Sequence, residues 1–596
     1  MMMRVAAIGL CLSVCLSPCW ALSYVESSNG LELPALEGGK TELEFCDINE
    51  DGNPDIVSIG DHGSPYIGTD EHGIMVWFGD GHGVWNVYQE GDFGYGGIAA
   101  GDVNNDGHLD IGCGMHHNYA DSGQLGAKLI EVALGNGTGQ NWVAWDSGLA
   151  EHGETYGMFG TDFADFNNDG WLDLVSNSFG GTAGVHAYIN SHDGRWDQSF
   201  GFTGGFSRMD IVCGDINNDG NVDFAVGQQF GTVYFGDGTG NFTLEDHNLP
   251  PPGGQGHSSV ALGDVDDDGA KELAFCRDAD RIEVYKWSVS GDSWQSLRGS
   301  LPLSGYEAVQ LCDMDSDGHT DLVGFGTGTG TVWRGDGQGN WTQAAGFTTP
   351  APGYFEALRV GGDIDHNGYP DITLVASEGS WPNDRNHLRC FKETSTADSL
   401  RITPAFPRGG EKFYVGSVQF VDWVCATPAT ETSKVGLELS TTGPSGPWSV
   451  VADSLMNSGR FQWTVPDEPS AECYIRYTAF SAHGTSTAAT PRPFVILPPT
   501  GVNGPLPGLG SGNVVARVIP NPAQCRVQLT YELPATCHVS ITLCDATGRV
   551  VSRLYQGSVP PGLHALSVDT RGLASGAYFL RLRAGTAESV RQLIVP

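Results

Sequence analysis

The chain has 596 residues, more than one compact hydrophobic core supports, so several domains are expected. Its formal net charge of −41 argues against nucleic acid or an anionic membrane as the main partner and favours cations. Glycine is frequent, with 85 residues, and 40% of the residues are hydrophobic, which is typical of turn-rich globular β structure rather than of helix bundles.

The N-terminus predicts a secretory signal peptide over residues 1–21. Arg4 precedes a short apolar run, and the run ends in Cys19-Trp20-Ala21, which suits cleavage after Ala21. The alternative is an uncleaved anchor, which the shortness of the run disfavours. No later run is long enough to cross a bilayer, so the mature chain is expected to lack a transmembrane segment and to be secreted or attached to the outer cell surface.

An acidic nine-residue pattern recurs seven times. Its copies start at residues 47, 102, 165, 215, 264, 313 and 363, so the spacings are 55, 63, 50, 49, 49 and 50 residues. Each copy has acidic or amide side chains at positions 1, 3, 5 and 9 and glycine at position 6. A period this regular predicts an array of similar supersecondary units.

Oxygen side chains with this spacing predict a hard-cation site, and calcium is the expected ion. An EF-hand is excluded, because position 12 is never glutamate and the flanking residues alternate like strands. The alternative is a set of acidic turns without metal. Because the carboxylates repel one another, we expect up to seven Ca²⁺ with a structural role. The predicted ligands are Asp47, Asn49, Asp51, Asp55, Asp102, Asn104, Asp106, Asp110, Asp165, Asn167, Asp169, Asp173, Asp215, Asn217, Asp219, Asp223, Asp264, Asp266, Asp268, Glu272, Asp313, Asp315, Asp317, Asp321, Asp363, Asp365, Asn367 and Asp371.

These loops resemble those of FG-GAP/VCBS repeats, the units of integrin α-chain propellers and of many secreted bacterial proteins. The resemblance covers residues 22–394, and a second recurring turn, such as Phe78-Gly-Asp-Gly-His-Gly-Val-Trp85, agrees with it. Four strands in each of seven units predict a seven-bladed β-propeller. The seventh unit lacks a fourth strand, so we expect residues 28–34 to supply it and close the ring, which removes exposed sheet edges.

If the calcium turns line one face of the propeller, the long insertions and the entries to the inner strands lie on the other face. Aromatic and histidine side chains there would suit a glycan or a peptide side chain. The alternative is that these aromatics pack blade against blade, and that the histidine pair is loop surface rather than a transition-metal site. The candidate ligand-binding residues are Tyr66, Tyr95, His116, His117, Tyr119, Tyr156, Phe206, His257, Tyr306, Tyr354, Trp381 and Arg385.

Beyond the repeats, short alternating strands separated by turns predict an antiparallel β-sandwich over residues 402–497. It resembles the Ig-like module of bacterial surface proteins, for which a spacer role is the default expectation. A proline- and glycine-rich linker follows over residues 498–513. The cysteines of the repeats occur singly and predict buried free thiols, whereas Cys425 and Cys473 are the one pair considered for a disulfide.

Residues 514–596 predict a third β domain. Its Pro520-Asn-Pro522, Gly548-Arg-Val-Val551 and Ser575-Gly-Ala-Tyr578 elements are similar to the C-terminal sorting domain of type IX secretion cargo, and nearly as similar to FlgD-type Ig-like domains. The resemblance implies an address read by outer-membrane secretion machinery, with a plain structural sandwich as the alternative. The expected fold is thus all-β, a seven-bladed β-propeller followed by two β-sandwich (Ig-like) domains.

Two functions are compared on this basis. The leading expectation is a secreted or cell-surface calcium-binding adhesion protein for an extracellular glycan or protein ligand. The alternative is an extracellular polysaccharide lyase or hydrolase on the propeller scaffold, with His257 or Tyr306 as a base beside a cation. The sequence shows no Ser-His-Asp order, zinc-ligand spacing or isolated carboxylate pair outside the loops, so a non-enzymatic role is favoured.

Overall fold

The structure is a computed structural model of the chain. By its internal contacts the chain forms two compact units, residues 1–500 and residues 501–596, which are described separately. No helix in the described segments is long and apolar enough to cross a membrane. The residues described are 22–31, 36–37, 42–60, 73–91, 93–94, 96–115, 125–154, 157–178, 184–202, 207–228, 231–250, 259–277, 281–326, 328–350, 357–378, 385–499, 516–519, 526–533, 537–545, 549–559, 562–571, 573, 576–584 and 587–595.

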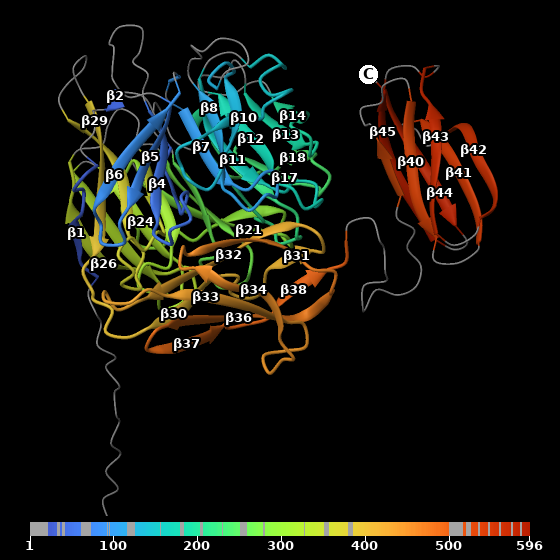
Figure 1. Ribbon diagram of the computed structural model, residues 1–596. Helices are drawn as coiled ribbons and strands as arrows, with labels where there is room; N and C mark the ends of the chain where they lie inside the picture. The colour runs from blue at the N-terminus through green and yellow to red at the C-terminus, as the bar shows by residue number, and fades with distance from the viewer. Residues whose placement is uncertain are drawn as a thin grey trace, which may run out of the picture. The chain divides into compact units, whose positions relative to one another are not determined.

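Seven antiparallel sheets form the first part of unit 1 (Figure 1). The first strand of each sheet contacts the first strand of the next, and β27 of the last sheet contacts β3 of the first, so the sheets close into a ring. Each sheet is one blade with four strands in sequence order, except that the N-terminal segment joins the seventh. The seven-bladed β-propeller expected from the repeats is therefore confirmed.

The strands of the blades have the following bounds. The first strands are β3 (Glu44–Cys46), β7 (Gly96–Gly101), β11 (Met158–Ala164), β15 (Ser207–Gly214), β19 (Val260–Gly263), β23 (Ala308–Cys312) and β27 (Leu358–Val360). The second strands are β4 (Asp55–Gly60), β8 (Asp110–Met115), β12 (Asp173–Ser178), β16 (Asp223–Gln228), β20 (Glu272–Arg277), β24 (Asp321–Gly326) and β28 (Ile372–Glu378). The third strands are β5 (Gly73–Gly79), β9 (Ile130–Leu134), β13 (Val185–Asn190), β17 (Val233–Gly236), β21 (Arg281–Ser288), β25 (Thr329–Gly335) and β29 (Arg385–Glu393). The fourth strands are β6 (Trp85–Glu90), β10 (Val143–Ala144), β14 (Trp196–Phe202), β18 (Phe242–Leu244), β22 (Ser293–Ser296), β26 (Trp341–Thr348) and β1 (Tyr24–Glu26).

Several second strands are buried along their whole length, namely β4, β8, β12 and β24. A strand inside a blade has a neighbouring blade on each face, so its residues are apolar on both faces rather than alternately. Between the first two blades, for example, Val57 and Ile59 pack with Ile98 and Ile111. The hydrophobic cores of the propeller therefore lie between blades.

The N-terminal segment supplies the outer strand of blade 7, but with different residues from those predicted. Strand β1, which precedes the predicted residues 28–34, pairs antiparallel with β29, with Tyr24 opposite Glu393. Residues 28–31 instead form a turn, closed by a Leu31 N–H to Ser28 carbonyl bond of 3.0 Å. Gly30 has φ of 91°, a left-handed conformation that ends a strand and favours glycine. A short strand β2 (Leu36–Glu37) pairs with the other end of β29.

In blades 1, 3, 5 and 6 a tryptophan at the start of the fourth strand joins the blade to the one before it. In blade 1 the indole N–H of Trp85 donates to the carbonyl of Ser27, in the N-terminal segment that completes blade 7. This bond therefore connects blade 1 to blade 7, where the ring closes. The indole N–H bonds run from Trp85 to Ser27 (2.9 Å), Trp196 to Trp145 (2.8 Å), Trp294 to Glu245 (2.9 Å) and Trp341 to Leu297 (2.9 Å).

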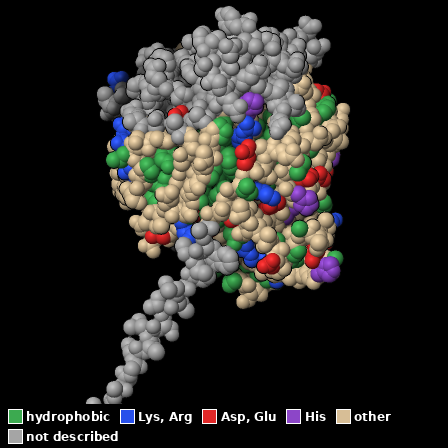
Figure 2. Space-filling view, turned by 90° about the vertical axis from the view of Figure 1, so that its left-hand side faces the viewer, with side chains coloured by type: hydrophobic (Ala, Val, Ile, Leu, Met, Phe, Trp, Pro, Cys, Tyr) green, Lys and Arg blue, Asp and Glu red, His purple; other side chains and the backbone are tan. Residues whose placement is uncertain are grey.

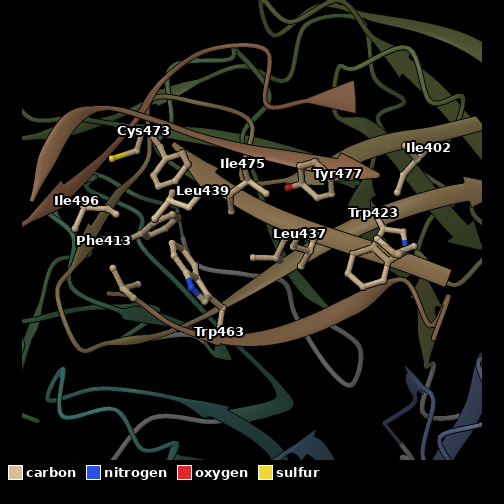
Figure 3. Packing of buried hydrophobic residues seen from close by; sticks show 14 of the residues in the cluster. Ile402, Phe413, Trp423, Leu437, Leu439, Trp463, Cys473, Ile475, Tyr477 and Ile496 are labelled. Atoms are coloured by element: carbon tan, nitrogen blue, oxygen red, sulfur yellow. The ribbon is translucent and has the colours of Figure 1, made fainter. Parts of the chain in front are cut away.

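The rest of unit 1 is a β-sandwich, here called the Ig-like module. One sheet has the order β30-β32-β35 and the other β31-β38-β36-β33-β34, with β37 beside β36. Figure 3 shows Trp423, Trp463 and Tyr477 among the side chains that fill its core. The strands are β30 (Arg401–Phe406), β31 (Lys412–Tyr414), β32 (Val418–Ala426), β33 (Lys434–Ser440), β34 (Ser449–Met456), β35 (Arg460–Thr464), β36 (Ser470–Ser481), β37 (Gly484–Ala489) and β38 (Phe494–Leu497).

The disulfide considered between Cys425 and Cys473 does not form. Both residues are buried free thiols, Cys425 on β32 in one sheet and Cys473 on β36 in the other. The Cys473 thiol donates instead to the Ser470 carbonyl at 3.5 Å. The single cysteines of the repeats are free thiols, as predicted, but only Cys113, Cys276 and Cys390 are buried; Cys46, Cys213 and Cys312 are half-buried.

Unit 2 is a second β-sandwich. Its sheets have the orders β39-β40-β43 and β42-β41-β44-β45. Val539, Ile541 and Leu582 lie in its core. The strands are β39 (Ala516–Ile519), β40 (Arg526–Leu533), β41 (Cys537–Asp545), β42 (Val550–Val559), β43 (Gly562–Asp569), β44 (Gly576–Ala584) and β45 (Ala587–Val595).

Candidate metal centres

The seven acidic loops join the first and second strands of the seven blades. They therefore lie along one edge of the ring, here called the loop edge. The backbone is the same in each: φ is between 54° and 60° at position 4 and between 90° and 102° at the glycine of position 6. Left-handed φ is uncommon for residues other than glycine, so its recurrence at position 4 shows that the loops share one specific conformation.

The first aspartate of each loop organises the backbone around itself. In loop 1, Asp47 accepts the N–H groups of Asp51 and Gly52, each at 2.9 Å. The first aspartates of the other six loops accept the same pair of N–H groups. This conserved bonding curls positions 1, 3 and 5 around a common centre.

The carboxylate at position 9 joins the loop to the blade. Asp55 accepts the N–H of Ile48 at 3.1 Å and the N–H of Gly79, at the end of the third strand, at 2.8 Å. The residues at position 9 are fully buried in all seven loops. Burial raises the pKa of Asp55 to about 8 and that of Glu272 to about 9, because a desolvated carboxylate disfavours its charged form.

This donor set fits a hard divalent cation. Carboxylate and amide oxygens are the ligands that calcium prefers. In the loops with Asp at position 3, ligand oxygens of positions 1, 3 and 9 lie within 4.8 Å of one another. Three ligand oxygens, Asp266 Oδ1, Glu272 Oε1 and Asp365 Oδ1, are buried without a hydrogen-bond partner. A bound cation would give these atoms the partner that burial otherwise denies them.

The loops bring acidic side chains into close groups: 23 of the 71 acidic residues stand at their ligand positions. All 28 predicted ligands are among the described residues, and the fold brings each set of four into one loop. On the flank shown in Figure 2, by contrast, the described red and blue side chains are scattered and form no acidic patch. A cation bound in each loop would therefore act where the charges are closest.

The sequence did not predict that the Ig-like module covers the loop edge. Strand β32 lies next to the ring (Figure 1), and residues of β30, β32 and β35 line the space between the ring and the module. The module contacts six of the seven loops by hydrogen bonds or an ion pair. The default expectation of a free spacer is therefore replaced by a docked module. The contacts are Gln462 with Asp102, Val418 with Asp165, Lys412 with Asn218, Arg492 with Asp267, Arg408 with Asp313 and Thr427 with His366.

A cavity of about 470 Å³ lies between the first strands of the blades and the module. Its walls carry charged side chains, including the ion pairs Arg359–Glu44 and Arg460–Asp422. Lys271 also lines it, with its ammonium group 5.0 Å from the centre of the Phe406 ring. Burial lowers the pKa of Lys271. The module thus closes over the end of the propeller channel at the loop edge.

Most candidate ligand-binding residues lie outside the described residues. Tyr306 is described: its hydroxyl bonds with Thr331 Oγ1 at 2.9 Å and its ring contacts Trp333 edge-on, which favours packing within its blade. Arg385 is described only as the first residue of β29. Those outside are Tyr66, Tyr95, His116, His117, Tyr119, Tyr156, Phe206, His257, Tyr354 and Trp381, and the predicted signal peptide is outside as well.

Comparison with protein families identifies two parts of the chain. Residues 47–113, 165–226 and 313–374 match the FG-GAP-like repeat, and residues 517–596 match the secretion system C-terminal sorting domain. No curated protein matches the chain. The chain therefore contains FG-GAP-like repeats and ends in a type IX sorting domain, which identifies it as a repeat protein exported to, or released from, the outer cell surface through that secretion machinery.

Solved structures give distant similarities. An Agrocybe aegerita lectin that recognises non-reducing terminal N-acetylglucosamine is 18% identical, with 52% of this chain and 80% of that chain covered and a TM-score of 0.37. AofleA from Arthrobotrys oligospora is 9% identical, with 55% and 92% covered and a TM-score of 0.30. Latent PorU from Porphyromonas gingivalis is 8% identical, with 61% and 35% covered and a TM-score of 0.15. Similarities at this level carry no information on function.

Proposed function

We propose that this exported repeat protein is a calcium-stabilised adhesion module, which binds a glycan or protein ligand at the edge of the propeller opposite the loop edge. The observation that carries the proposal is the docked Ig-like module. Because the module docks on the loop edge through six of the seven loops, it occupies the surface that a partner would otherwise contact there. The opposite edge of the propeller is then the one at which a ligand can bind.

Calcium is supported by the loops themselves. Each loop brings three or four carboxylates together, and those at position 9 are fully buried. Seven such groups of like charge in one ring oppose folding unless cations neutralise them. Extracellular calcium modules bind with dissociation constants of about 10⁻⁴–10⁻³ M, which suits a stabilising rather than a signalling role.

The opposite edge is supported by the lengths of the connections there. Second strands end and third strands begin at this edge, and in blade 1 the chain runs from Gly60 to Gly73 between them. In blade 2 it runs from Met115 to Ile130, whereas in blade 6 it runs only from Gly326 to Thr329. Long connections in a compact fold usually serve function. We therefore assign ligand binding to the long connections of blades 1 and 2, together with Trp381 of blade 7.

A panel of glycans and matrix proteins, probed with and without EGTA, tests the proposal. We expect at least one ligand to bind in calcium, and Tyr119→Ala and Trp381→Ala to lose that binding without a change in melting temperature. Val289→Ser, at an exposed turn away from this edge, is the control that should bind normally. Unchanged binding by both edge variants would overturn the assignment.

The enzyme alternative is separated by a second measurement. Release of unsaturated or reducing products from uronic-acid polymers by the purified chain would favour a lyase or hydrolase over an adhesion module. The hydrogen bond of Tyr306 with Thr331 and its contact with Trp333 make this tyrosine a packing residue rather than a free base. For this reason we place catalysis second.

A further inference from the structure

The seven loops fall into two classes, and the third strand of the blade changes with the loop. Position 3 is Asn in blades 1–4 and Asp in blades 5–7. Continuing the register of the second and third strands by one residue places one third-strand residue opposite position 9, and this residue is apolar in blades 1–4 and cationic in blades 5–7. These residues are, in blade order, Phe78, Leu134, Ile189, Phe235, Lys286, Arg334 and Lys392.

In the first class the amide of Asn bonds the neighbouring carboxylate. Asn49 Nδ2 donates to Asp51 Oδ2 at 3.0 Å. The same bond, from position 3 to position 5, measures 2.9 Å in loop 2 and 2.8 Å in loop 3. Asn thus offers an oxygen to the centre of the loop and an N–H donor to the next ligand, without adding charge.

In the second class Asp at position 3 has no such donor, and the third strand supplies one. Lys286 Nζ lies 2.5 Å from both Asp266 Oδ2 and Asp268 Oδ2, so it joins the same two positions that the Asn amide joins in the first class. Lys392 Nζ lies 2.9 Å from Asp365 Oδ2. In blade 6, Arg334 forms the equivalent ion pair with Asp315.

The protein cation contacts only one oxygen of each of these aspartates. Asp266 Oδ1 and Asp365 Oδ1 are buried and have no hydrogen-bond partner, whereas Asp315 Oδ1 accepts the N–H of Asp317 at 3.1 Å. In loops 5 and 7 one oxygen of position 3 is therefore paired with the protein cation and the other is left for a bound metal ion. Among the described residues, no Lys or Arg pairs with a ligand of blades 1–4; their only such contact is from His192 to Asp169, at 3.1 Å.

We propose that Lys286, Arg334 and Lys392 are positioning residues of the cation sites, which replace the Asn amide where position 3 is Asp. Each holds one oxygen of that aspartate and leaves the other for the metal, and in loops 5 and 6 it keeps the charge of the loop near that of the first class. The inference rests on the proposed calcium binding but concerns residues outside the nine-residue pattern.

Counting charges shows why the two changes occur together. Three carboxylates at similar separations form three repulsive pairs, as in loops 1–4. The four carboxylates of loop 5 form six repulsive pairs. Lys286 adds four attractive pairs, so the net excess of repulsive pairs is two, close to the three of the first class. Without the lysine all six would remain. In loops 5 and 6 the fourth carboxylate is therefore accompanied by a cation. Loop 7 has three carboxylates, because position 5 is Asn367, and its Asp365 is also paired with a cation, Lys392.

A double-mutant cycle in blade 5 tests the pairing in the full chain. Lys286→Phe should lower the melting temperature in EGTA by a few degrees and should enlarge the increase that Ca²⁺ then produces. Lys286→Phe combined with Asp266→Asn recreates a loop of the first class and should restore the wild-type melting temperature in both conditions. Equal losses in the single and double variants would overturn the proposal.

Blade 4 offers the reciprocal experiment. Asn217→Asp should destabilise the chain in EGTA, and adding Phe235→Lys should recover most of the loss. If the added lysine deepens the loss, the proposal is wrong.

Calcium titration of the wild type by calorimetry tests the proposed function separately from the pairing. Absence of calcium binding would contradict the proposed function. The variants measured in EGTA would still decide whether the cation and the aspartate are paired.

Discussion

The backbone N–H of Val418, in the Ig-like module, donates to Asp165 Oδ2, in the third acidic loop, at 2.9 Å across 253 residues of sequence. The same carboxylate oxygen accepts the N–H of Gly170 inside its loop at 3.0 Å. One atom therefore links the conformation of a candidate calcium site to the docking of the module. Similar contacts at five other loops make the loop edge and the module a single packed unit.

The first prediction follows from this link: removal of calcium should loosen the module. Without cations the loop carboxylates repel one another, and the docking contacts depend on loop geometry. In EGTA we expect faster amide hydrogen exchange in the loops and in β30, β32 and β35, measured by mass spectrometry on the full chain. Strands β41 and β44 of unit 2 are the internal control. Calcium binding without any change of exchange in the module would contradict the link.

A second prediction compares two loop glycines with the same backbone. Gly107 and Gly269 both have φ of 93°, but a Cβ at Gly107 would meet nothing within 4 Å, whereas one at Gly269 would lie 2.3 Å from the carbonyl carbon of Gly410 in the module. Gly107→Ala should cost only the strain of left-handed φ, about 1–2 kcal/mol in the free energy of unfolding. Gly269→Ala should cost more and should also loosen the module.

Chemical denaturation and hydrogen exchange on both variants measure the difference. The free energy of unfolding reports the backbone strain that the two alanines share, and exchange in β30–β32 reports docking. Gly107→Ala is thus the matched control for Gly269→Ala. If the two variants behave alike, the module does not rest on loop 5 as described.

The third prediction concerns the carboxylates at position 9. Asp223 accepts the N–H groups of Ile216 and Gly236, at 2.9 and 2.8 Å, and is fully buried. Asp223→Ala leaves these two donors, and the N–H of Asn217 at 3.3 Å, without this acceptor, at about 1–3 kcal/mol each. This loss should persist in EGTA, because it arises from hydrogen bonds rather than from metal. A loss seen only in calcium would mean that Asp223 acts solely as a ligand.

The sequence was sufficient for the fold because its main signal is periodic. The spacing of the seven loops predicted the blades, and each predicted ligand lies in its loop. The N-terminal strand was placed a few residues too late, because the pattern of residues 28–34 looked like a strand although Gly30 makes a turn there.

The docking of the module and the pairing of Lys286, Arg334 and Lys392 with the loops could not be predicted from the period of the sequence, for a physical reason. The contact of Val418 with Asp165 joins two domains, and no periodicity encodes such a contact. The match between Asp266 and Lys286 was visible in the residues, but it requires the register that places Lys286 opposite position 9. Once the strand pairing is known, the sequence shows that the change from Asn to Asp at position 3 and the change from an apolar residue to a cation on the third strand occur together, between blades 4 and 5.

The last prediction concerns closure of the ring. Trp85 donates its indole N–H to the Ser27 carbonyl at 2.9 Å, as Trp341 does to Leu297, so Trp85→Phe and Trp341→Phe should each cost about 0.5–1.5 kcal/mol in the free energy of unfolding. Deleting residues 22–31 should do more, because it exposes the edge of β29, which is otherwise paired with β1. We expect this deletion to promote concentration-dependent association, measured by light scattering, whereas Trp85→Phe should stay monodisperse. A deletion variant that remains as stable and as monodisperse as the full chain would show that β1 is not the strand that closes the propeller.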